Sequence, residues 1–130
     1  MMGDVVVHHQ IVHADIHLQN PRGEVALHLA ACHYESQFQI DVLRLLLDHG
    51  ADANARDNEG STPLHHSSFR RPGPFPSCMG SVEGTCLLLE HGANIDAENN
   101  KGDTPFMVAL KTDYHEMVEF LWGLGTMLVY

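Results

Sequence analysis

The residues of this sequence best suited to chemistry are its histidines, of which the chain has 11 among 130 residues. His9, His13 and His17 recur every four residues, and in a single helix over residues 4–17 they would lie on one face. Imidazole nitrogens at that spacing can bind a transition-metal ion. The pattern therefore raises the hypothesis of a metal- or pH-responsive binder that uses the N-terminal histidines.

A second interpretation of the same segment removes this site. Residues 5–12 could instead be the remnant of a helix, followed by a hairpin over residues 13–18, and this arrangement breaks the alignment of the three histidines. Apart from Asp15, no further ligand is close in sequence. We therefore predict no physiological metal site and keep the metal-responsive binder as an alternative.

The three cysteines, Cys32, Cys78 and Cys86, are odd in number and lack C-x-x-C spacing. This pattern predicts neither a disulfide framework nor a cysteine-type zinc site. Cys86 stands beside a run of three leucines, which is typical of a buried structural thiol. Free thiols indicate a reducing compartment, so we expect an intracellular protein, in the cytoplasm or the nucleus.

Motifs that carry catalysis are missing from the sequence. It has no glycine-rich phosphate loop, no G-x-S-x-G, no H-E-x-x-H and no cysteine–histidine pair at a recognised spacing. We therefore predict that the protein is not an enzyme and needs no cofactor.

The composition narrows the classes of partner. Seven Lys and Arg stand against 17 Asp and Glu, a formal net charge of −10, which disfavours nucleic acid because a phosphate backbone requires clustered cations. The N-terminus carries Asp4 and several histidines within its apolar run, unlike a signal peptide. No apolar stretch approaches the roughly 18 residues of a membrane span. The sequence therefore predicts neither a nucleic-acid nor a membrane partner.

One pattern of turn and helices occurs three times along the chain. Each unit opens with a glycine-containing turn and closes with an apolar helix that ends at a second glycine. The opening glycines are Gly23, Gly60 and Gly102, and the closing glycines are Gly50, Gly92 and Gly125.

Local sequence chemistry predicts two helices in each unit. Thr62-Pro63 and Thr104-Pro105 place an N-cap residue directly before a proline that suits the first helical position. The closing helices have apolar residues at i, i+3 and i+4, the spacing of one helix face. These residues are Leu43, Leu46 and Leu47 in the first unit and Val118, Leu121 and Trp122 in the third.

These motifs resemble the ankyrin repeat. The segments HGADANARDNEG (49–60), STPLHHSS (61–68) and HGANIDAENNKGDTP (91–105) are similar to its hallmark, G-x-T-P-L-H-x-A-A followed by L-L-x-x-G-A-x-x-N-A. The resemblance covers about residues 19–126. It implies an all-α solenoid of stacked helix–turn–helix repeats with connecting hairpin loops. Such units stack because a lone helix pair cannot bury its apolar face.

The resemblance divides the chain into a partial N-terminal repeat, residues 1–18, and an ankyrin repeat domain, residues 19–130. The first and second repeats are longer than the third between their two glycines, which predicts insertions between the helices near 34–37 and 71–79. The repeats are expected at about 19–55, 56–97 and 98–130.

The resemblance also implies structural roles for four histidines. His28 and His65 match the histidine of the T-P-L-H motif, which bridges backbone groups of adjacent turns. His49 and His91 precede the closing glycines, where a partly protonated imidazole is favourable at a helix C-terminus.

Departures from the family pattern predict positions at which the fold is less stable. Val25-Ala26 replaces the cap and proline of the first unit, and Met107 replaces the histidine of the third. Trp122 and residues 128–130 are apolar at an end with no following unit. We therefore expect marginal stability, self-association through uncapped ends, or a natural context in a longer chain.

In ankyrin proteins the binding surface is the concave side, made of the hairpin tips and the exposed face of the first helices. The resemblance implies that a protein partner of unknown identity contacts this surface. The expected contact residues are Arg22, Glu24, His33, Asn58, Glu59, Ser61, Phe69, Arg70, Asn100, Lys101, Asp103 and Lys111, with Arg71 and Phe75 from the second insertion. Arg70, Arg71 and Phe75 form a cationic-aromatic cluster in an acidic chain, although such an insertion is often only tolerated length.

The sequence thus predicts a non-catalytic protein–protein interaction module. One alternative is a truncated or orphan repeat fragment with a structural role only. The other is the metal- or pH-responsive binder that uses the N-terminal histidines.

Overall fold

The computed structural model describes residues 16–32, 37–70 and 82–129, and for Cys32, residues 37–39 and residues 125–129 it describes the backbone alone. The helices in these ranges are α2 (Ala26–Cys32), α3 (Gln37–Asp48), α4 (Pro63–Ser67), α5 (Val82–Glu90), α6 (Pro105–Lys111) and α7 (His115–Val129). The insertions predicted near 34–37 and 71–79 lie outside the described residues, apart from Gln37, which begins α3. None of these described helices combines the length and the apolar character that a bilayer crossing needs.

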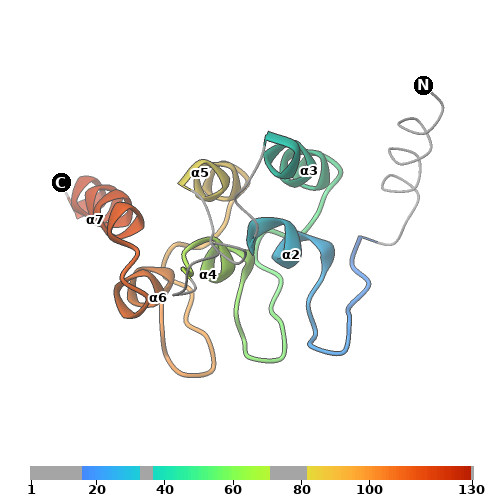
Figure 1. Ribbon diagram of the computed structural model, residues 1–130, viewed down its shortest axis with the longest axis horizontal. Helices are drawn as coiled ribbons and strands as arrows, with labels where there is room; N and C mark the ends of the chain where they lie inside the picture. Colours follow the sequence, from blue (N-terminus) through green and yellow to red (C-terminus); the bar gives the residue numbers. More distant parts are fainter. Residues whose placement is uncertain (1–15, 33–36, 71–81, 130) are drawn as a thin grey trace.

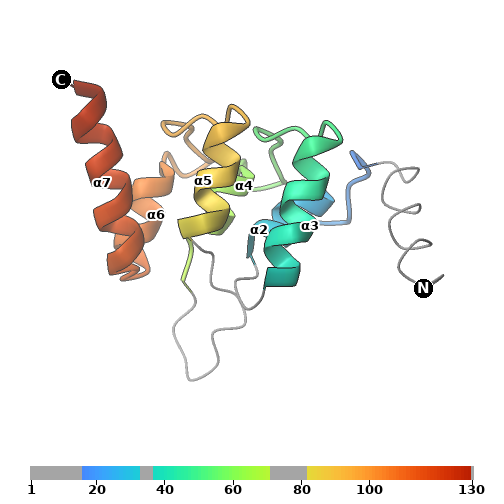
Figure 2. The ribbon, with the colours of Figure 1, turned by 90° about the horizontal axis from the view of Figure 1, so that it is seen from above.

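The helices form two layers (Figure 1). The first layer contains α2, α4 and α6, the second contains α3, α5 and α7, and the hairpin loops project to one side of the first layer. Seen from above, the helices of the second layer lie side by side (Figure 2). Each helix contacts its partner in the pair and the corresponding helix of the neighbouring pair. The stacked helix–turn–helix solenoid that the sequence predicted is therefore confirmed.

The starts of the first-layer helices follow their local sequence. Thr62 and Thr104 each accept a hydrogen bond from the N–H group three residues further on, and a proline follows each of them at the first helical position. Val25 stands at the same place before α2 and has no side-chain oxygen. Its own N–H donates instead to Nδ1 of His28 at 3.0 Å. The first unit therefore lacks a cap of the kind whose loss costs about 1 kcal/mol.

The ends of the second-layer helices agree with the prediction in two cases of three. Gly50 and Gly92 both have φ of 89°, the left-handed conformation that ends α3 and α5. The prediction that a helix ends at Gly125 is wrong, because α7 continues through it to Val129. Polar turn residues follow Gly50 and Gly92, whereas residues 126–129 contain no Gly, Pro, Asn or Asp that would favour a turn.

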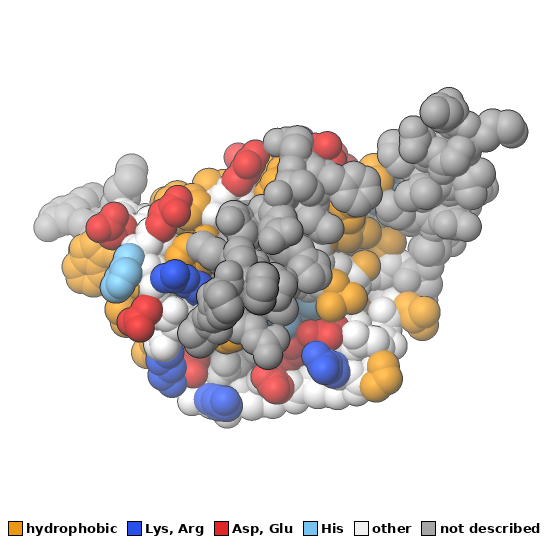
Figure 3. Space-filling view, viewed as in Figure 1, with side chains coloured by type: hydrophobic (Ala, Val, Ile, Leu, Met, Phe, Trp, Pro, Cys, Tyr) orange, Lys and Arg blue, Asp and Glu red, His pale blue; other side chains and the backbone are white. Residues whose placement is uncertain are grey.

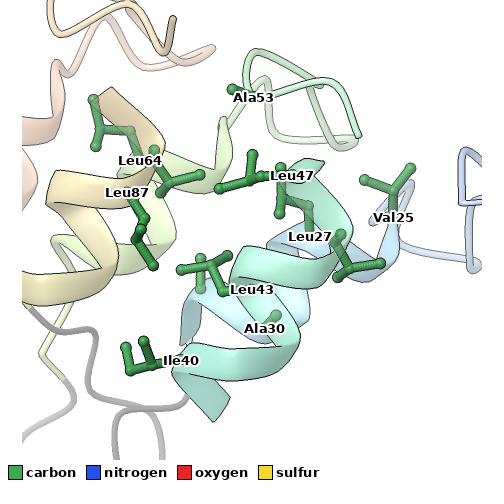
Figure 4. Close-up of a cluster of buried hydrophobic side chains, with 12 residues drawn as sticks. Val25, Leu27, Ala30, Ile40, Leu43, Leu47, Ala53, Leu64 and Leu87 are labelled. Atoms are coloured by element: carbon green, nitrogen blue, oxygen red, sulfur yellow. The ribbon is translucent and has the colours of Figure 1, made fainter. Parts of the chain in front are cut away.

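The main hydrophobic core lies between the two layers (Figure 4). Leu43, Leu46 and Leu47 of α3 are all buried, as their helical spacing predicted. They share this core with Leu27 of α2 and Leu64 of α4, both of which are fully buried. Residues from two neighbouring helix pairs therefore enclose one core, so neither pair could bury its apolar face alone.

The third helix pair has a second buried cluster. Leu121 lies in it, and Val118 packs against it partly buried, but Trp122 at the same helical spacing is 65% exposed. α7 is the last described helix of its layer (Figure 1), and the ring of Trp122 packs at a tilt against Phe106 of α6, with 6.1 Å between the centroids. The buried members of the cluster are Ala109, Tyr114, Met117 and Leu121.

Two hydrogen bonds join each hairpin to the next, and we call these four bonds together the hairpin ladder. Asn58 donates its backbone N–H to the carbonyl of Arg22 and its side-chain amide to that of Pro21, both at 2.9 Å. Asn100 repeats the arrangement one hairpin later. Its backbone N–H donates to the carbonyl of Glu59 at 2.9 Å, and its amide donates to that of Asn58 at 3.1 Å.

The hairpin ladder requires glycine for two separate reasons. Gly23, Gly60 and Gly102 have φ of 76°, 75° and 80°, which other residues rarely adopt. A Cβ on Gly60 would also lie 2.4 Å from Oδ1 of Asn100, and Gly23 has the same relation to Asn58. The space beside Gly102 is open. Gly102 is therefore needed for its backbone conformation alone.

Gly60→Ala and Gly102→Ala form a matched pair that separates these two reasons. Both place alanine in the left-handed region, so we expect each to lose about 1–2 kcal/mol of unfolding free energy. Gly60→Ala also displaces Asn100 and so breaks its hydrogen bonds to the second hairpin. We therefore expect this variant to lose about 1–2 kcal/mol more of its unfolding free energy. Urea denaturation followed by circular dichroism measures the difference. Equal losses would show that the ladder contributes little to stability.

Candidate interaction surface

A buried histidine connects α2 to the second hairpin. Nδ1 of His28 accepts the hydrogen bond from Val25, which places the ring proton on Nε2. That Nε2–H group lies 2.9 Å from the carbonyl of Ala55 and 3.0 Å from the carbonyl of Ser61. Both ring nitrogens are therefore occupied by backbone groups.

His65 connects α4 to the third hairpin in the same way. Its Nδ1 accepts from the N–H of Thr62 at 3.0 Å, and its Nε2–H donates to the carbonyl of Asp103 at 2.8 Å. His28 and His65 thus each contact backbone groups of two adjacent turns, the arrangement that the family resemblance implied. His49 and His91 also lie at helix C-termini as expected, with Nδ1 at 2.8 Å and 2.9 Å from the carbonyl four residues before each of them.

Each hairpin is closed by an Asn or Asp that the sequence analysis missed. Oδ1 of Asp57 accepts from the N–H groups of Glu59 and Ser61, both at 2.9 Å. Asn20 and Asn99 make the same pair of bonds in the first and third hairpins. The signal was available, because an Asn or Asp stands three residues before each opening glycine.

A second series of hydrogen bonds, also missed, joins the loops that follow the second-layer helices. The amide of Asn54 donates to the carbonyl of Gly92 at 3.0 Å, and its Oδ1 accepts from the N–H of Asn94 at 2.8 Å. Nη1 of Arg56 donates to the carbonyl of Glu98 at 2.7 Å. Neighbouring units are thus fixed to one another on both sides of the hairpins.

His66 of α4 meets two acidic side chains beside the hairpins. Its Nε2 lies 2.9 Å from Oδ2 of Asp57 and 4.0 Å from Oε2 of Glu24. The ring of His28 packs edge-on against it, with 5.0 Å between the centroids. All these side chains are buried or mostly buried, so this cluster adds a further link between the first two units.

Three of these side chains, His28, Asp57 and His66, are close enough to one another to hold a metal ion. His28 has no lone pair to offer, because its Nδ1 accepts from Val25 and its Nε2 carries the bridging proton. Two remaining ligands are too few for a protein metal centre. The cluster is therefore better described as a hydrogen-bonded link.

The N-terminal histidines can be followed only in part. His9 and His13 lie outside the described residues, while His17 is exposed in a turn over residues 16–17. A helix over residues 4–17 therefore does not reach His17, which removes the single face that the metal hypothesis required.

The thiol of Cys86 lacks the features of a nucleophile. Burial raises its pKa, and the charges of Glu90 and Glu83 raise it further, so the group is a neutral thiol near pH 7. It is partly exposed in α5, rather than buried as its leucine neighbours suggested.

Seven of the eleven predicted contact residues that the structure describes are exposed. Glu24 and Phe69 are partly buried, and His33, Arg71 and Phe75 lie outside the described residues. The exposed members of the set are Arg22, Asn58, Glu59, Arg70, Asn100, Lys101 and Lys111.

Ser61 and Asp103 do not belong to the exposed set, because each is only 8% exposed. They lie where a hairpin turns into a helix, and their carbonyls accept from the bridging histidines. The carboxylate of Asp103 also binds Nζ of Lys111 at 2.7 Å and 2.9 Å. The sequence pattern placed both residues at the hairpin tips, whereas the structure buries them at the junction of hairpin and helix.

Arg70 is exposed but held in place. Its N–H donates to Oγ1 of Thr112, and its Nη1 donates to the carbonyl of Asp113, both at 3.2 Å. These bonds tie the end of the second unit to the loop between α6 and α7. The guanidinium group is therefore presented in one orientation beside the hairpins.

Burial lowers the pKa of His28 and of His65 below 6.5, and the nearby charge of His66 lowers both further. The bonded carbonyls act in the opposite sense but do not outweigh burial. Burial alone would raise the pKa of Asp57, but hydrogen bonds from His66 and from the N–H groups of Ser61 and Glu59 outweigh it and lower the pKa. The folded chain therefore favours neutral His28, neutral His65 and ionised Asp57.

We expect the free energy of unfolding to fall as the pH drops below about 6.5. Between that value and the lowered folded values, the unfolded chain binds protons at His28 and His65 that the folded chain excludes. A second loss begins below pH 3.8, where Asp57 is protonated first in the unfolded chain. Urea denaturation between about pH 8 and pH 5 tests the first step. His65→Ala should weaken the pH dependence, whereas His115→Ala, an exposed control, should leave it unchanged.

Comparisons with known proteins agree with this geometry. The family model described as ankyrin repeats, in three copies, matches residues 2–73, and the model of a single ankyrin repeat matches residues 59–100. The NF-kappa-B inhibitor cactus of Drosophila melanogaster is 49% identical over 53 residues, which are 40% of this chain and 10% of cactus. The neurogenic locus notch homolog protein 2 of Homo sapiens is 51% identical over 53 residues, 40% of this chain and 2% of its own length. The chain thus spans a small part of these relatives, and it belongs to the ankyrin repeat family.

Proposed function

We propose that this chain binds a protein partner through the concave side of its stack, formed by the hairpin tips and the neighbouring ends of the first-layer helices. Ankyrin repeats are generally protein–protein interaction modules. Cactus is by its name an inhibitor of NF-kappa-B, which is consistent with a protein as partner. The family does not determine the partner of the present chain, which depends on the residues of its own surface.

The observation that carries this proposal is the rigidity of the hairpins. Each one is closed by its own Asn or Asp and joined to the next by the hairpin ladder. The side chains at the tips therefore begin from a fixed backbone. A surface that is already ordered loses less conformational entropy on binding, so more of the contact energy appears as affinity.

The hairpin tips also carry a defined charge pattern. Arg22, Glu59 and Lys101 occupy the same position in successive hairpins and are all exposed, so the charge changes sign from one tip to the next. Both signs are visible along the hairpin edge in Figure 3. Arg70 and Lys111 add positive charge at the ends of the first-layer helices. This pattern favours a partner whose own charges alternate over the same span.

Phe69→Ala with Arg70→Ala tests this surface. We expect the double variant to weaken binding at least tenfold, because Phe69 supplies apolar contact and Arg70 a fixed guanidinium group. Partners captured by the wild-type chain would be titrated by calorimetry against both forms. Glu83→Ala with Glu90→Ala, two exposed charges on α5 in the other layer, is the matched control and should not change the affinity. Equal binding by all three forms would mean that the concave side is the wrong surface.

A further inference from the structure

The hairpin tips carry three charged side chains at equivalent positions, and we call this series the tip row. Arg22, Glu59 and Lys101 each directly precede the opening glycine of a hairpin, and all three are exposed. Within the part of the chain that the structure describes, none of them forms an ion pair. The hairpin ladder fixes the backbone from which they extend. The charges of the tip row are therefore ordered along the stack and available to a partner.

The exposed charges of the second layer are different. Of the Lys and Arg residues that the structure describes, only Arg44 lies on a second-layer helix, and it pairs with Asp41 at 3.6 Å. In Figure 3 the charged side chains visible along the second layer are acidic, whereas Lys and Arg lie nearer the hairpins. A segment with more acids than bases is therefore repelled by the second layer and directed to the tip row. The exposed carboxylates of the second-layer helices are Asp41, Asp48, Glu83, Glu90, Glu116 and Glu119.

The backbone of the hairpins is already fully engaged as a donor. Apart from Pro21, which has no N–H, every N–H of residues 20–24, 57–61 and 99–103 donates a hydrogen bond within the chain. Every carbonyl of residues 20–24 and 57–61 also accepts one. An extended partner segment would thus gain no main-chain hydrogen bond from the first two hairpins, and its own buried backbone groups would lose those that they make with water.

An α-helix does not have this disadvantage, because it pairs its own backbone groups and can bind through side chains alone. Its repeat also matches the stack. Packed helices lie about 8–10 Å apart, which sets the interval between units, and two helical turns rise about 10.8 Å. Residues i, i+7 and i+14 lie on nearly one face of a helix, with a drift of about 20° per step. The residues on one face of a strand recur every 6.7 Å or so, which fits this interval poorly.

We propose that the tip row binds an α-helix of the partner that carries an acid, a base and an acid at positions i, i+7 and i+14. The two acids face Arg22 and Lys101, and the base faces Glu59. Each such pair is exposed to solvent and weak by itself, so the register of all three selects the helix. This inference rests on the proposed function, because it names the kind of segment that the concave side takes.

Two alanine-based helical peptides, each held helical by a hydrocarbon staple on the opposite face, test the register. The first carries Glu at i and i+14 and Lys at i+7. The second has the same composition, but its Lys is at i+9 and points away from the tips. Titrations are followed by the amide NMR signals of Arg22, Glu59 and Lys101. We expect saturable shifts with the first peptide and about threefold weaker binding of the second, which loses the central pair.

A charge exchange tests the central pair directly. Glu59→Lys should weaken binding of the first peptide and strengthen binding of a third peptide, in which Glu replaces the Lys at i+7. We expect the preference between these two peptides to change about tenfold, because attraction and repulsion are interchanged. Glu83→Lys, at an exposed position of α5, makes the same change in net charge and should leave the preference unaltered. Urea unfolding of both variants should stay close to wild type, since both side chains are exposed.

The proposal is overturned if no saturable shift occurs, if the first two peptides bind equally, or if Glu59→Lys and Glu83→Lys change the preference alike. A proline-rich peptide with the same three charges every third residue is the extended competitor, because a polyproline helix rises about 9.3 Å per turn. Tighter binding of that peptide would also overturn the helix. A protein partner that requires Phe69 and Arg70 but binds Glu59→Lys as well as wild type would contradict this inference alone and leave the proposed function standing.

Discussion

The hydrogen bonds between successive hairpins are the constraint on which this structure depends. A hairpin that projects from a short helix has backbone groups that its own unit leaves unpaired, and buried groups of that kind are costly. Here the next unit supplies the partners, through the hairpin ladder on the outside and through His28 and His65 on the inside. The polar groups therefore fix how far apart the units lie and how they are rotated. The apolar core between the layers then fills a space whose dimensions are already set.

The parts of the fold that the sequence predicted correctly are those decided within a few residues. Thr62 and Thr104 start helices, and Gly50 and Gly92 end them, because each acts on N–H or C=O groups of its own turn. The prediction that a helix ends at Gly125 was wrong because no turn residues follow this glycine, and α7 continues to Val129. The closing residues Asn20, Asp57 and Asn99 were equally local and could have been recognised from their fixed distance to the opening glycines.

The parts that could not be predicted depend on what lies across the stack. Ser61 and Asp103 have the composition of a hairpin surface, but the bridging histidines of the preceding unit hold them at 8% exposure. Trp122 has the spacing of a core residue, yet it is exposed because no described helix lies beyond α7. Periodicity tells which residues share a helix face. It does not tell whether a neighbour covers that face.

The first described hairpin differs chemically from the two that follow it, because Pro21 stands where they have Asn58 and Asn100. A repeated surface that could accept its own opposite end would join copies without limit, because a head-to-tail contact does not close. Pro21 prevents the polar half of that contact, since it removes both donors from the first hairpin while leaving its carbonyl to accept from Asn58. Among the described hairpins, the ladder therefore runs in one direction, from each Asn to carbonyls of the hairpin before it, and Pro21 can only accept.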